Sequence, residues 1–146
     1  MRGFEVISKY KGEYVNIPTR KTASSAGYDI EVIKDYIIMP KSVCLVETGL
    51  KAYMGDDEVL KIYVRSSLAM KKGIMLANNV GIIDSDYYNN PDNEGHIMIM
   101  LYNFSNEEVI IKKYDRVAQG IFEKYLKTDN DNSLVERLGG FGSTGR

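Results

Sequence analysis

The stretch Val59-Leu60-Lys61-Ile62-Tyr63-Val64 decides the fold class of this chain. Its even-numbered residues are all apolar, whereas Lys61 and Tyr63 fall on the opposite face, which is the period-two pattern of a half-buried β-strand. Turn signals separate this stretch from similar short apolar runs, which are expected to form strands at Glu5–Tyr10, Tyr28–Ile33, Tyr36–Met39, Ser42–Thr48, His96–Leu101, Val109–Ile111 and Val117–Phe122. Many short strands at regular spacing predict an all-β sandwich or barrel.

Two segments add detail to this strand pattern. His96–Leu101 is apolar on both faces, so we expect a strand that is covered on both sides, by a second sheet or by another subunit. One segment has the pattern of a helix: Ser66 or Ser67 can cap it, residues 68–72 form it, and Gly73 can end it. The sequence therefore predicts one short helix among the strands.

The composition is that of a single globular domain. The chain has 146 residues, a formal net charge of -1 and 44% hydrophobic residues, which fits one domain and gives no general attraction to nucleic acid. The single Cys44 excludes an intrachain disulfide and a zinc site of the CxxC type, and the single His96 excludes a His-rich metal site. The sequence has no run near the roughly 20 apolar residues of a membrane span and no secretory segment at its start. We expect a cytoplasmic protein with no membrane partner and no direct nucleic-acid partner.

The C-terminal residues 139–146 differ in kind from the rest, because they hold four of the 13 glycines. Such a segment cannot form a stable strand or helix. It is either a disordered tail or an arm that becomes ordered on a ligand, with backbone N–H groups that approach phosphate oxygens. Phe141 favours the arm, because an aromatic ring in a tail has no core to fill but can stack on a planar base.

Four internal segments each allow two interpretations. Gly81–Tyr87 places two aspartates after apolar residues, which is typical of a strand that ends in a polar turn. Arg65-Ser66-Ser67 suits either an anion site or an ordinary helix cap. Arg116–Gln119 offers a cation and an amide three residues apart, which an exposed salt bridge explains equally well. In Ala26–Asp29, the aspartate is either a turn residue or a carboxylate that orients the hydration shell of Mg²⁺.

Taken together and in this order, these segments resemble the five motifs of the trimeric dUTP diphosphatases, or dUTPases, at Ala26–Ile30, Arg65–Ala69, Gly81–Tyr87, Arg116–Gln119 and Arg137–Gly145. The resemblance implies a jelly-roll-like β-sandwich or barrel with one short helix, assembled as a homotrimer. It divides the chain into a β domain at 1–136 and a flexible glycine-rich arm at 137–146 that closes over the nucleotide. The implied reaction converts dUTP and water to dUMP and pyrophosphate with Mg²⁺ as cofactor.

The resemblance also implies a role for residues of the first and third motifs. Asp84 is similar to the catalytic carboxylate that activates the attacking water, and Tyr87 to the residue whose ring packs on deoxyribose and leaves no room for a 2′-hydroxyl. Asn78 corresponds to a contact with the uracil edge. A hairpin over residues 78–87, with Gly81 and Ile83 among its substrate-binding positions, is expected to present main-chain groups to the base. Asp29 resembles the acidic residue near metal-bound waters.

The remaining motifs supply the expected phosphate ligands. Ser66 and Gln119 resemble ligands of the phosphate chain, and Arg65 and Ser67 lie beside them in the sequence. In the arm, Phe141 is expected to cover the uracil. Three further residues of the arm are expected to reach the terminal phosphates, namely Arg137, Ser143 and Thr144. Gly142 is also expected to bind substrate.

The segment Tyr88–Gly95 departs from the family, which often continues with Arg-Gly-Glu after the tyrosine. Any role of the missing arginine and glutamate is thus put in doubt. Two alternatives to a dUTPase stay open. One is a dCTP deaminase of related fold. The other is a binding or regulatory protein that contacts a partner protein, for which the unusual Tyr88–Gly95 turn is a candidate surface.

Overall fold

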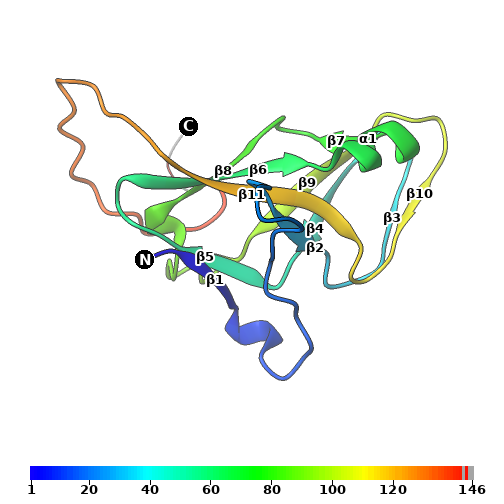
Figure 1. Ribbon diagram of the computed structural model, residues 1–146, viewed down its shortest axis with the longest axis horizontal. Helices are drawn as coiled ribbons and strands as arrows, with labels where there is room; N and C mark the ends of the chain where they lie inside the picture. Colours follow the sequence, from blue (N-terminus) through cyan, green and yellow to red (C-terminus); the bar gives the residue numbers. More distant parts are fainter. Residues whose placement is uncertain (143, 145–146) are drawn as a thin grey trace.

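The structure is a computed structural model that describes residues 1–142 and 144 (Figure 1). Short strands dominate it, and one α-helix lies among them. The strands are β1 Gly3–Val6, β2 Tyr28–Glu31, β3 Tyr36–Ile38, β4 Val43–Glu47, β5 Leu50–Tyr53, β6 Glu58–Val64, β7 Ile74–Leu76, β8 Gly81–Asp84, β9 Met98–Asn103, β10 Val109–Ile111 and β11 Arg116–Lys124. The helix α1 is Ser66–Lys72, and two 3₁₀ turns, η1 and η2, cover Ser8–Tyr10 and Ser85–Tyr87. The prediction of an all-β fold with one short helix is confirmed.

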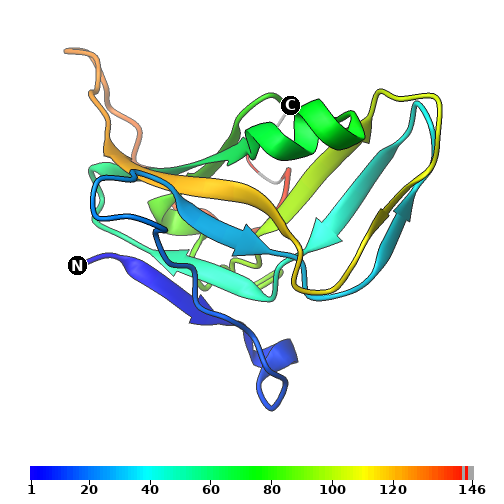
Figure 2. The same ribbon diagram turned by 45° about the vertical axis from the view of Figure 1, so that its right-hand side comes forward.

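All strand pairs are antiparallel and form four sheets. The largest has the order β2-β11-β6-β8, and a second has the order β4-β9-β7. Two strand pairs, β1-β5 and β10-β3, complete the set (Figures 1 and 2). After β11 the chain leaves the sheets, runs outward over residues 125–136 and returns as the arm (Figure 1). Among the described residues, we find no helix whose length and apolar character would let it span a bilayer.

One hydrophobic core joins the four sheets, and Leu60 of the quoted stretch lies fully buried in it. The core takes side chains from every sheet, among them Phe4, Ile30, Ile38, Val46, Leu50, Leu101, Ile111 and Ala118. Burying one such aliphatic side chain stabilises the fold by about 1.5–3 kcal/mol. The alternation read from Val59–Val64 is therefore what fixes β6, with its apolar face toward this core.

Three expectations about local structure are wrong. The predicted strand Glu5–Tyr10 ends at Val6, because Ile7 and Tyr10 turn inward into a small second core cluster with Ile33. Neither Ser66 nor Ser67 caps the helix; Arg65 is the N-cap, and its carbonyl oxygen accepts the N–H of Leu68 at 3.0 Å.

The predicted hairpin at residues 78–87 is also absent. β7 pairs with β9 whereas β8 pairs with β6, so residues 77–80 cross from one sheet to the other. The strands β5 and β7 were not predicted. In β5 the buried Lys51 hides the alternation, because its ammonium group is accommodated by Glu94 at 2.8 Å.

The strand β9 shows why residues 96–101 are apolar on both faces. Its odd-numbered residues, such as Ile99 and Leu101, are buried in the core, whereas Met98 and Met100 on the other face are half-buried. The core therefore covers one face, whereas the expected cover of the second face by another sheet or subunit stays a prediction. The second face lines the pocket described below.

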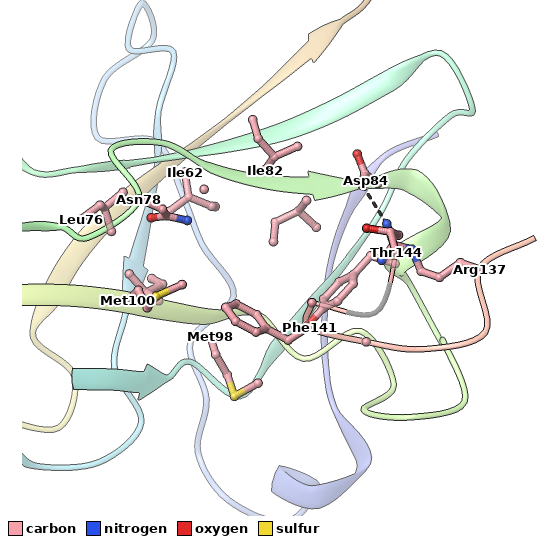
Figure 3. A pocket seen from close by; sticks show the side chains of 16 residues that line it. Ile62, Leu76, Asn78, Ile82, Asp84, Met98, Met100, Arg137, Phe141 and Thr144 are labelled. Carbon is pink, nitrogen blue, oxygen red and sulfur yellow. Dashed lines mark hydrogen bonds and ion pairs between the residues drawn. The ribbon is translucent and has the colours of Figure 1, made fainter. Parts of the chain in front are cut away.

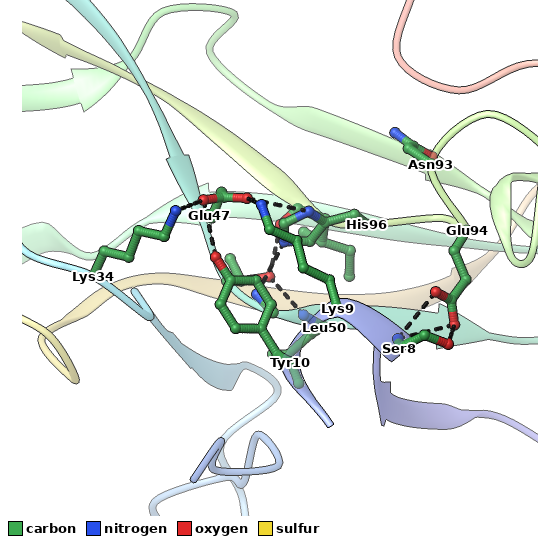
Figure 4. A network of polar contacts seen from close by, with 12 residues as sticks. Ser8, Lys9, Tyr10, Lys34, Glu47, Leu50, Asn93, Glu94 and His96 are labelled. Carbon is green, nitrogen blue, oxygen red and sulfur yellow. Dashed lines mark hydrogen bonds and ion pairs between the residues drawn. The ribbon is translucent and has the colours of Figure 1, made fainter. Parts of the chain in front are cut away.

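A cluster of charged groups joins β4 to the N-terminal segment (Figure 4). The Glu47 carboxylate contacts the ammonium groups of Lys34 at 2.5 Å and Lys9 at 2.7 Å, and it accepts the Tyr10 hydroxyl at 3.0 Å. Burial acts to raise the pKa of Glu47, but these hydrogen bonds outweigh it and lower the pKa to about 2. His96 lies nearby, buried, and its Nε2 accepts the N–H of Gly49 at 3.0 Å.

We predict that Glu47 stabilises the fold at neutral pH and that this contribution is lost in acid. Because the folded pKa lies below the ordinary value of 4.5, the contribution is complete above about pH 4.5 and disappears as the pH falls toward 2. Glu47→Gln should lower the free energy of unfolding at pH 7 by on the order of 1 kcal/mol, measured by urea denaturation. The difference from wild type should shrink between pH 4.5 and 2. The exposed Glu108→Gln serves as control, and an equal loss in both variants would contradict the assignment.

Candidate functional site

A pocket of about 190 Å³ lies between β8, β9 and the returning arm (Figure 3). Nine of the residues expected in the site line it, namely Asn78, Gly81, Ile83, Asp84, Tyr87, Arg137, Phe141, Gly142 and Thr144. Ser143, also expected there, lies outside the described residues. The ion pairs of Arg137 with Asp84 and Asp86 join the arm to β8 and η2, so segments far apart in the sequence line one pocket.

The pocket has apolar walls and polar ends. Figure 3 shows Asn78 and Leu76 toward one end and Asp84 with Arg137 toward the other. Between the two ends, Phe141 points from the arm toward Met98 and Met100 of β9 (Figure 3). Apolar walls with hydrogen-bonding groups at the ends suit a planar ring that carries polar atoms on its rim.

Sequence reasoning did not place the two methionines in the site. Met98 and Met100 came from a run whose doubly apolar pattern was interpreted only as a covered strand. The pattern did hold the signal, because a second apolar face that is left half-exposed by the core has to be covered by something else. Here that face lines the pocket with the aromatic ring of the arm.

At the polar end, Arg137 bridges two aspartates. Its Nη2 lies 2.8 Å from Oδ2 of Asp84, and its Nε lies 2.7 Å from Oδ1 of Asp86. The guanidinium side chain is 9% exposed, whereas both carboxylates are about half exposed. Asp86 was not expected in the site, although its place two residues after Asp84 was visible in the sequence. The expected contact of Arg137 with terminal phosphates stays a prediction, since here the guanidinium group lies on carboxylates.

Tyr87 is held through its hydroxyl group. The hydroxyl donates to the carbonyl oxygen of His96 at 2.8 Å and accepts from Nδ2 of Asn93 at 2.8 Å. The guanidinium carbon of Arg137 lies 5.7 Å from the ring centroid. Burial raises the pKa of Tyr87, so the phenol stays protonated at neutral pH and keeps its role as donor. The ring is thereby fixed in one position on the pocket wall.

The other expected site residues form a second cluster elsewhere on the chain. A shallow depression is lined by Asp29, Arg65, Ser66, Ser67 and Gln119, together with Lys21, Ser25 and Gly27. Asp29 and Gln119 face each other in the β2–β11 register. Gly27 cannot be replaced without displacing Gln119, because an added Cβ would collide with the Gln119 side chain. We call this group the second cluster.

The sheet order separates the second cluster from Asp84. Asp29 and Gln119 are in register with Tyr63, whereas Asp84 is in register with Val59 at the other end of β6. Asp29 and Asp84 thus lie on opposite edge strands, three strand spacings and four residues apart, which amounts to roughly 20 Å. Within one chain, the second cluster cannot contact a phosphate that Asp84 also reaches.

The described residues contain no group of three or more His, Cys, Asp or Glu side chains arranged to hold a metal ion. Asp29 is already engaged, since it lies 3.6 Å from Nε of Arg65 and 3.4 Å from Nη1 of Arg116. A single, paired carboxylate does not make an inner coordination site. It fits a contact with the water shell of a magnesium ion that is bound by other ligands.

Comparison with known proteins agrees with this geometry. Residues 13–145 match the model of the family described as dUTPase. The deoxyuridine 5′-triphosphate nucleotidohydrolase of Lactococcus lactis subsp. lactis (strain IL1403) is 54% identical over 147 residues, covering 99% of this chain and 98% of the relative. The crystal structure of dUTPase from Streptococcus mutans superposes with a TM-score of 0.82 at 44% identity, covering 88% of this chain and 99% of that chain. A mutant dUTPase from phage phi11 of S. aureus, solved with a structural Mg(II) ion, shares the fold with a TM-score of 0.74 at 16% identity, over 94% of this chain and 97% of its own.

The fold and the pocket thus define an all-β protein with a ring-sized site beneath a glycine-rich arm. The match over residues 13–145 and the 54% identity to a full-length relative identify its family. The chain belongs to the dUTPase family.

We predict that Arg137 fastens the arm to the β domain. Arg137→Ala removes both ion pairs, and because the carboxylates are half exposed, the loss is only on the order of 1 kcal/mol. Hydrogen exchange of the amides at 139–142 should therefore become about fivefold faster, which mass spectrometry can measure. Arg137→Lys is the matched control, because it keeps the positive charge without the forked geometry of the guanidinium group. Its exchange rate should lie between those of wild type and Arg137→Ala. Unchanged exchange in Arg137→Ala would show that the ion pairs do not hold the arm.

Proposed function

We propose that this protein hydrolyses dUTP to dUMP and pyrophosphate. The observation that carries the proposal is a ring-sized pocket with Asn78 toward one end and the exposed carboxylate of Asp84 at the other. Family membership and the close relative named as a deoxyuridine triphosphate nucleotidohydrolase support it. In a cell, such a dUTP diphosphatase would limit incorporation of uracil into DNA and supply dUMP for dTTP synthesis.

The arrangement of polar groups in the pocket suggests where each part of the substrate would bind. Uracil would lie between Phe141 and the methionines of β9, with its polar edge toward Asn78 and the main chain of residues 81–83. Asp84 would take a proton from a water whose oxygen attacks the α-phosphorus. The bond from that phosphorus to the bridging oxygen then breaks, and pyrophosphate leaves. General base assistance of this kind contributes about 10²–10⁴ in rate.

The second cluster supplies the phosphate ligands only if another subunit brings it to the pocket. Ser66 and Ser67 are exposed and do not cap the helix, so their hydroxyl groups are available to an anion beside Arg65 and Gln119. Because roughly 20 Å separates this cluster from Asp84 within one chain, we assign the two halves of each site to different chains. The homotrimer expected from the motifs provides such an arrangement.

Exposed apolar side chains support association of chains. On β4, Val43 and Leu45 are 56% and 42% exposed, and Leu45 is in register with Met100 of β9. On the neighbouring strand pair, Ile37 and Ile110 face each other in register and are 61% and 50% exposed. Apolar sheet faces of this kind mark contact surfaces. We therefore propose that they contribute to contacts between subunits, together with the exposed apolar residues of segment 125–136.

Asp29 is the residue of the second cluster that would contact a magnesium ion held by the triphosphate, through the water shell of that ion. Bound to the triphosphate, the ion would neutralise negative charge on the phosphates and on the leaving pyrophosphate. Asp29 would hold its water shell through a hydrogen bond, as its pairing with Arg65 and Arg116 allows. Arg65 and Arg116 would add positive charge near the phosphate chain.

The activity is tested by measuring pyrophosphate release from dUTP, dTTP, dCTP and UTP with Mg²⁺, and ammonia release from dCTP. The proposal expects pyrophosphate from dUTP and little from the other three nucleotides. Ammonia from dCTP would instead assign the chain to the deaminases. A lack of turnover with dUTP would leave a binding or regulatory role, for which a partner protein stays a prediction.

We predict that Asp84→Asn abolishes turnover but keeps nucleotide affinity. The amide cannot take up the proton of the attacking water, so kcat should fall by about 10²–10⁴. Asp86→Asn is the matched control, because it also removes a carboxylate partner of Arg137 but not the base. Steady-state kinetics and calorimetry with a non-hydrolysable dUTP analogue separate the two effects. If Asp84→Asn retained normal kcat, Asp84 would not be the base.

We predict that Tyr87→Ala admits UTP. Without the fixed ring, a 2′-hydroxyl finds room, and the ratio of kcat/KM for dUTP to that for UTP should fall by on the order of tenfold. Tyr87→Phe keeps the ring and should retain most of the selectivity. Equal selectivity in wild type and Tyr87→Ala would remove this residue from sugar recognition.

A further inference from the structure

The loop at residues 88–95, which follows the third motif, is held together by hydrogen bonds of its own side chains. The side chain of Asn90 is buried and organises the turn: its Nδ2 donates to the carbonyl oxygen of Tyr87 at 2.7 Å, and its Oδ1 accepts the N–H of Asp92 at 3.0 Å and of Asn93 at 3.1 Å. Oδ1 of Asn93 in turn accepts the N–H of Gly95 at 3.0 Å. These bonds fix where the side chains of Asp92 and Asn93 point.

The loop is also anchored to the β1–β5 sheet. Glu94 accepts the ammonium group of Lys51 at 2.8 Å and the N–H of Ser8 at 3.0 Å, and the same Lys51 donates to Asn89 at 2.6 Å. Hydrogen bonds from Lys51 and Ser8 lower the pKa of Glu94 to about 2, so this anchor stays charged at neutral pH. The loop therefore behaves as part of the β domain rather than as a free surface turn.

This loop meets the C-terminal arm. Oδ2 of Asp92 accepts the backbone N–H of Gly140 at 3.2 Å. Gly140 is buried, and a Cβ placed on it would lie 2.6 Å from Cγ of Asn93. The arm can approach this closely only because residue 140 has no side chain. Asp92 thus binds the arm, and Asn93 forms the surface on which it rests.

The same Asn93 holds Tyr87. Its Nδ2 donates to the Tyr87 hydroxyl at 2.8 Å, while the same amide group packs against Gly140. One side chain is thereby in contact with both the arm and the residue assigned to sugar recognition. Tyr87 has a second partner, the carbonyl oxygen of His96, which accepts its hydroxyl group at 2.8 Å.

We propose that the loop at residues 88–95 is the docking site of the arm, and that Asn93 is a positioning residue that couples docking of the arm to the placement of the Tyr87 ring. The proposal deepens the proposed function and rests on it for the role of Tyr87. Closure of the arm over the base would then also increase the selectivity for dUTP over UTP.

Docking is tested with Asp92→Ala and its matched control Asp92→Asn, which keeps a carbonyl oxygen as acceptor for Gly140. Loss of one charge-assisted hydrogen bond on an exposed group should weaken binding of a non-hydrolysable dUTP analogue about fivefold in Asp92→Ala, measured by calorimetry with Mg²⁺. Asp92→Asn should recover most of this loss. Pro91→Ala, an exposed change in the same turn, controls for disturbance of the loop.

A double-mutant cycle shows whether Asp92 acts through the arm. In a chain that ends at Arg137, Asp92→Ala should have no further effect on affinity for the analogue. An equal loss of affinity in the shortened and the full chain would overturn the docking role, because Asp92 would then act without the arm.

The coupling is tested with Asn93→Ala, whose thermal unfolding is recorded first. We expect the ratio of kcat/KM for dUTP to that for UTP to fall about fivefold. Asp92→Ala should lower this ratio by less, because it loosens docking but leaves the hydrogen bond between Asn93 and Tyr87 in place. If Asn93→Ala does not fold, Gly140→Ala probes the same contact from the arm, and it should reduce analogue affinity and dUTP selectivity together. Unchanged selectivity in the variant that folds would overturn the coupling.

The proposed function and the proposed docking site can be tested separately. If wild-type protein does not hydrolyse dUTP, the proposed function fails, but hydrogen exchange at Gly140 in the free protein still reports docking. Faster exchange in Asp92→Ala than in Asp92→Asn would then support the docking site. Equal exchange in all variants would overturn it.

Discussion

The antiparallel order β2-β11-β6-β8 is the constraint on which the site depends. It places Asp29 on one edge strand and Asp84 on the other, and the register along β6 adds four residues of distance between them. The two halves of the chemistry are therefore fixed on a rigid sheet and cannot approach by local movement of side chains. Each half is well formed by itself, since one is a pocket with a carboxylate at its end and the other a depression rich in hydroxyl and guanidinium groups. In the proposed site, a second chain would present its depression to the pocket of the first.

The arm follows a different physical logic from the β domain. The core is held by apolar burial, whereas the arm is held by polar contacts of Arg137 with two aspartates and of Gly140 with Asp92, plus the half-exposed ring of Phe141. Segments with few apolar contacts open at low free energy. As the proposed lid, such an arm would open readily for product release. It would close on defined partners, because Asp84 is held in β8, Asp86 in the turn η2 and Asp92 in the loop at residues 88–95. The guanidinium group that closes the arm also lies on the proposed base, so binding of a triphosphate would draw it toward a new set of anionic oxygens.

Much of the fold could be predicted from local patterns, because the alternation in Val59–Val64 and in similar runs reports which face meets the core. The patterns failed where a tertiary contact overrode them. Ile7 and Tyr10 turn inward into the small core that they form with Ile33, and Lys51 is buried with Glu94 as its partner. Nine of the expected site residues line the pocket, whereas Asp29, Arg65, Ser66, Ser67 and Gln119 lie in the second cluster. The motifs could not predict that Asp29 and Asp84 lie on opposite edges of one sheet, because strand order is a property of the whole chain. The contacts of Asn93 were likewise hidden, since nothing in Asn90-Pro91-Asp92-Asn93 by itself indicates a partner 47 residues further along the chain at Gly140.

Mixing of inactive subunits tests most directly whether each site is shared between chains. Asp84→Asn disables the pocket, and Ser66→Ala/Gln119→Ala disables the second cluster of the same chain. If the two halves of a site come from different chains, refolding the two variants together in equal amounts should restore about a quarter of wild-type dUTP turnover, since that fraction of randomly assembled sites has both halves intact. Mixing Asp84→Asn with Tyr87→Ala, which has its change in the same pocket but stays active on dUTP, should give only the average of the separate activities. A mixture of the first pair that stays inactive while forming mixed oligomers would contradict the shared site.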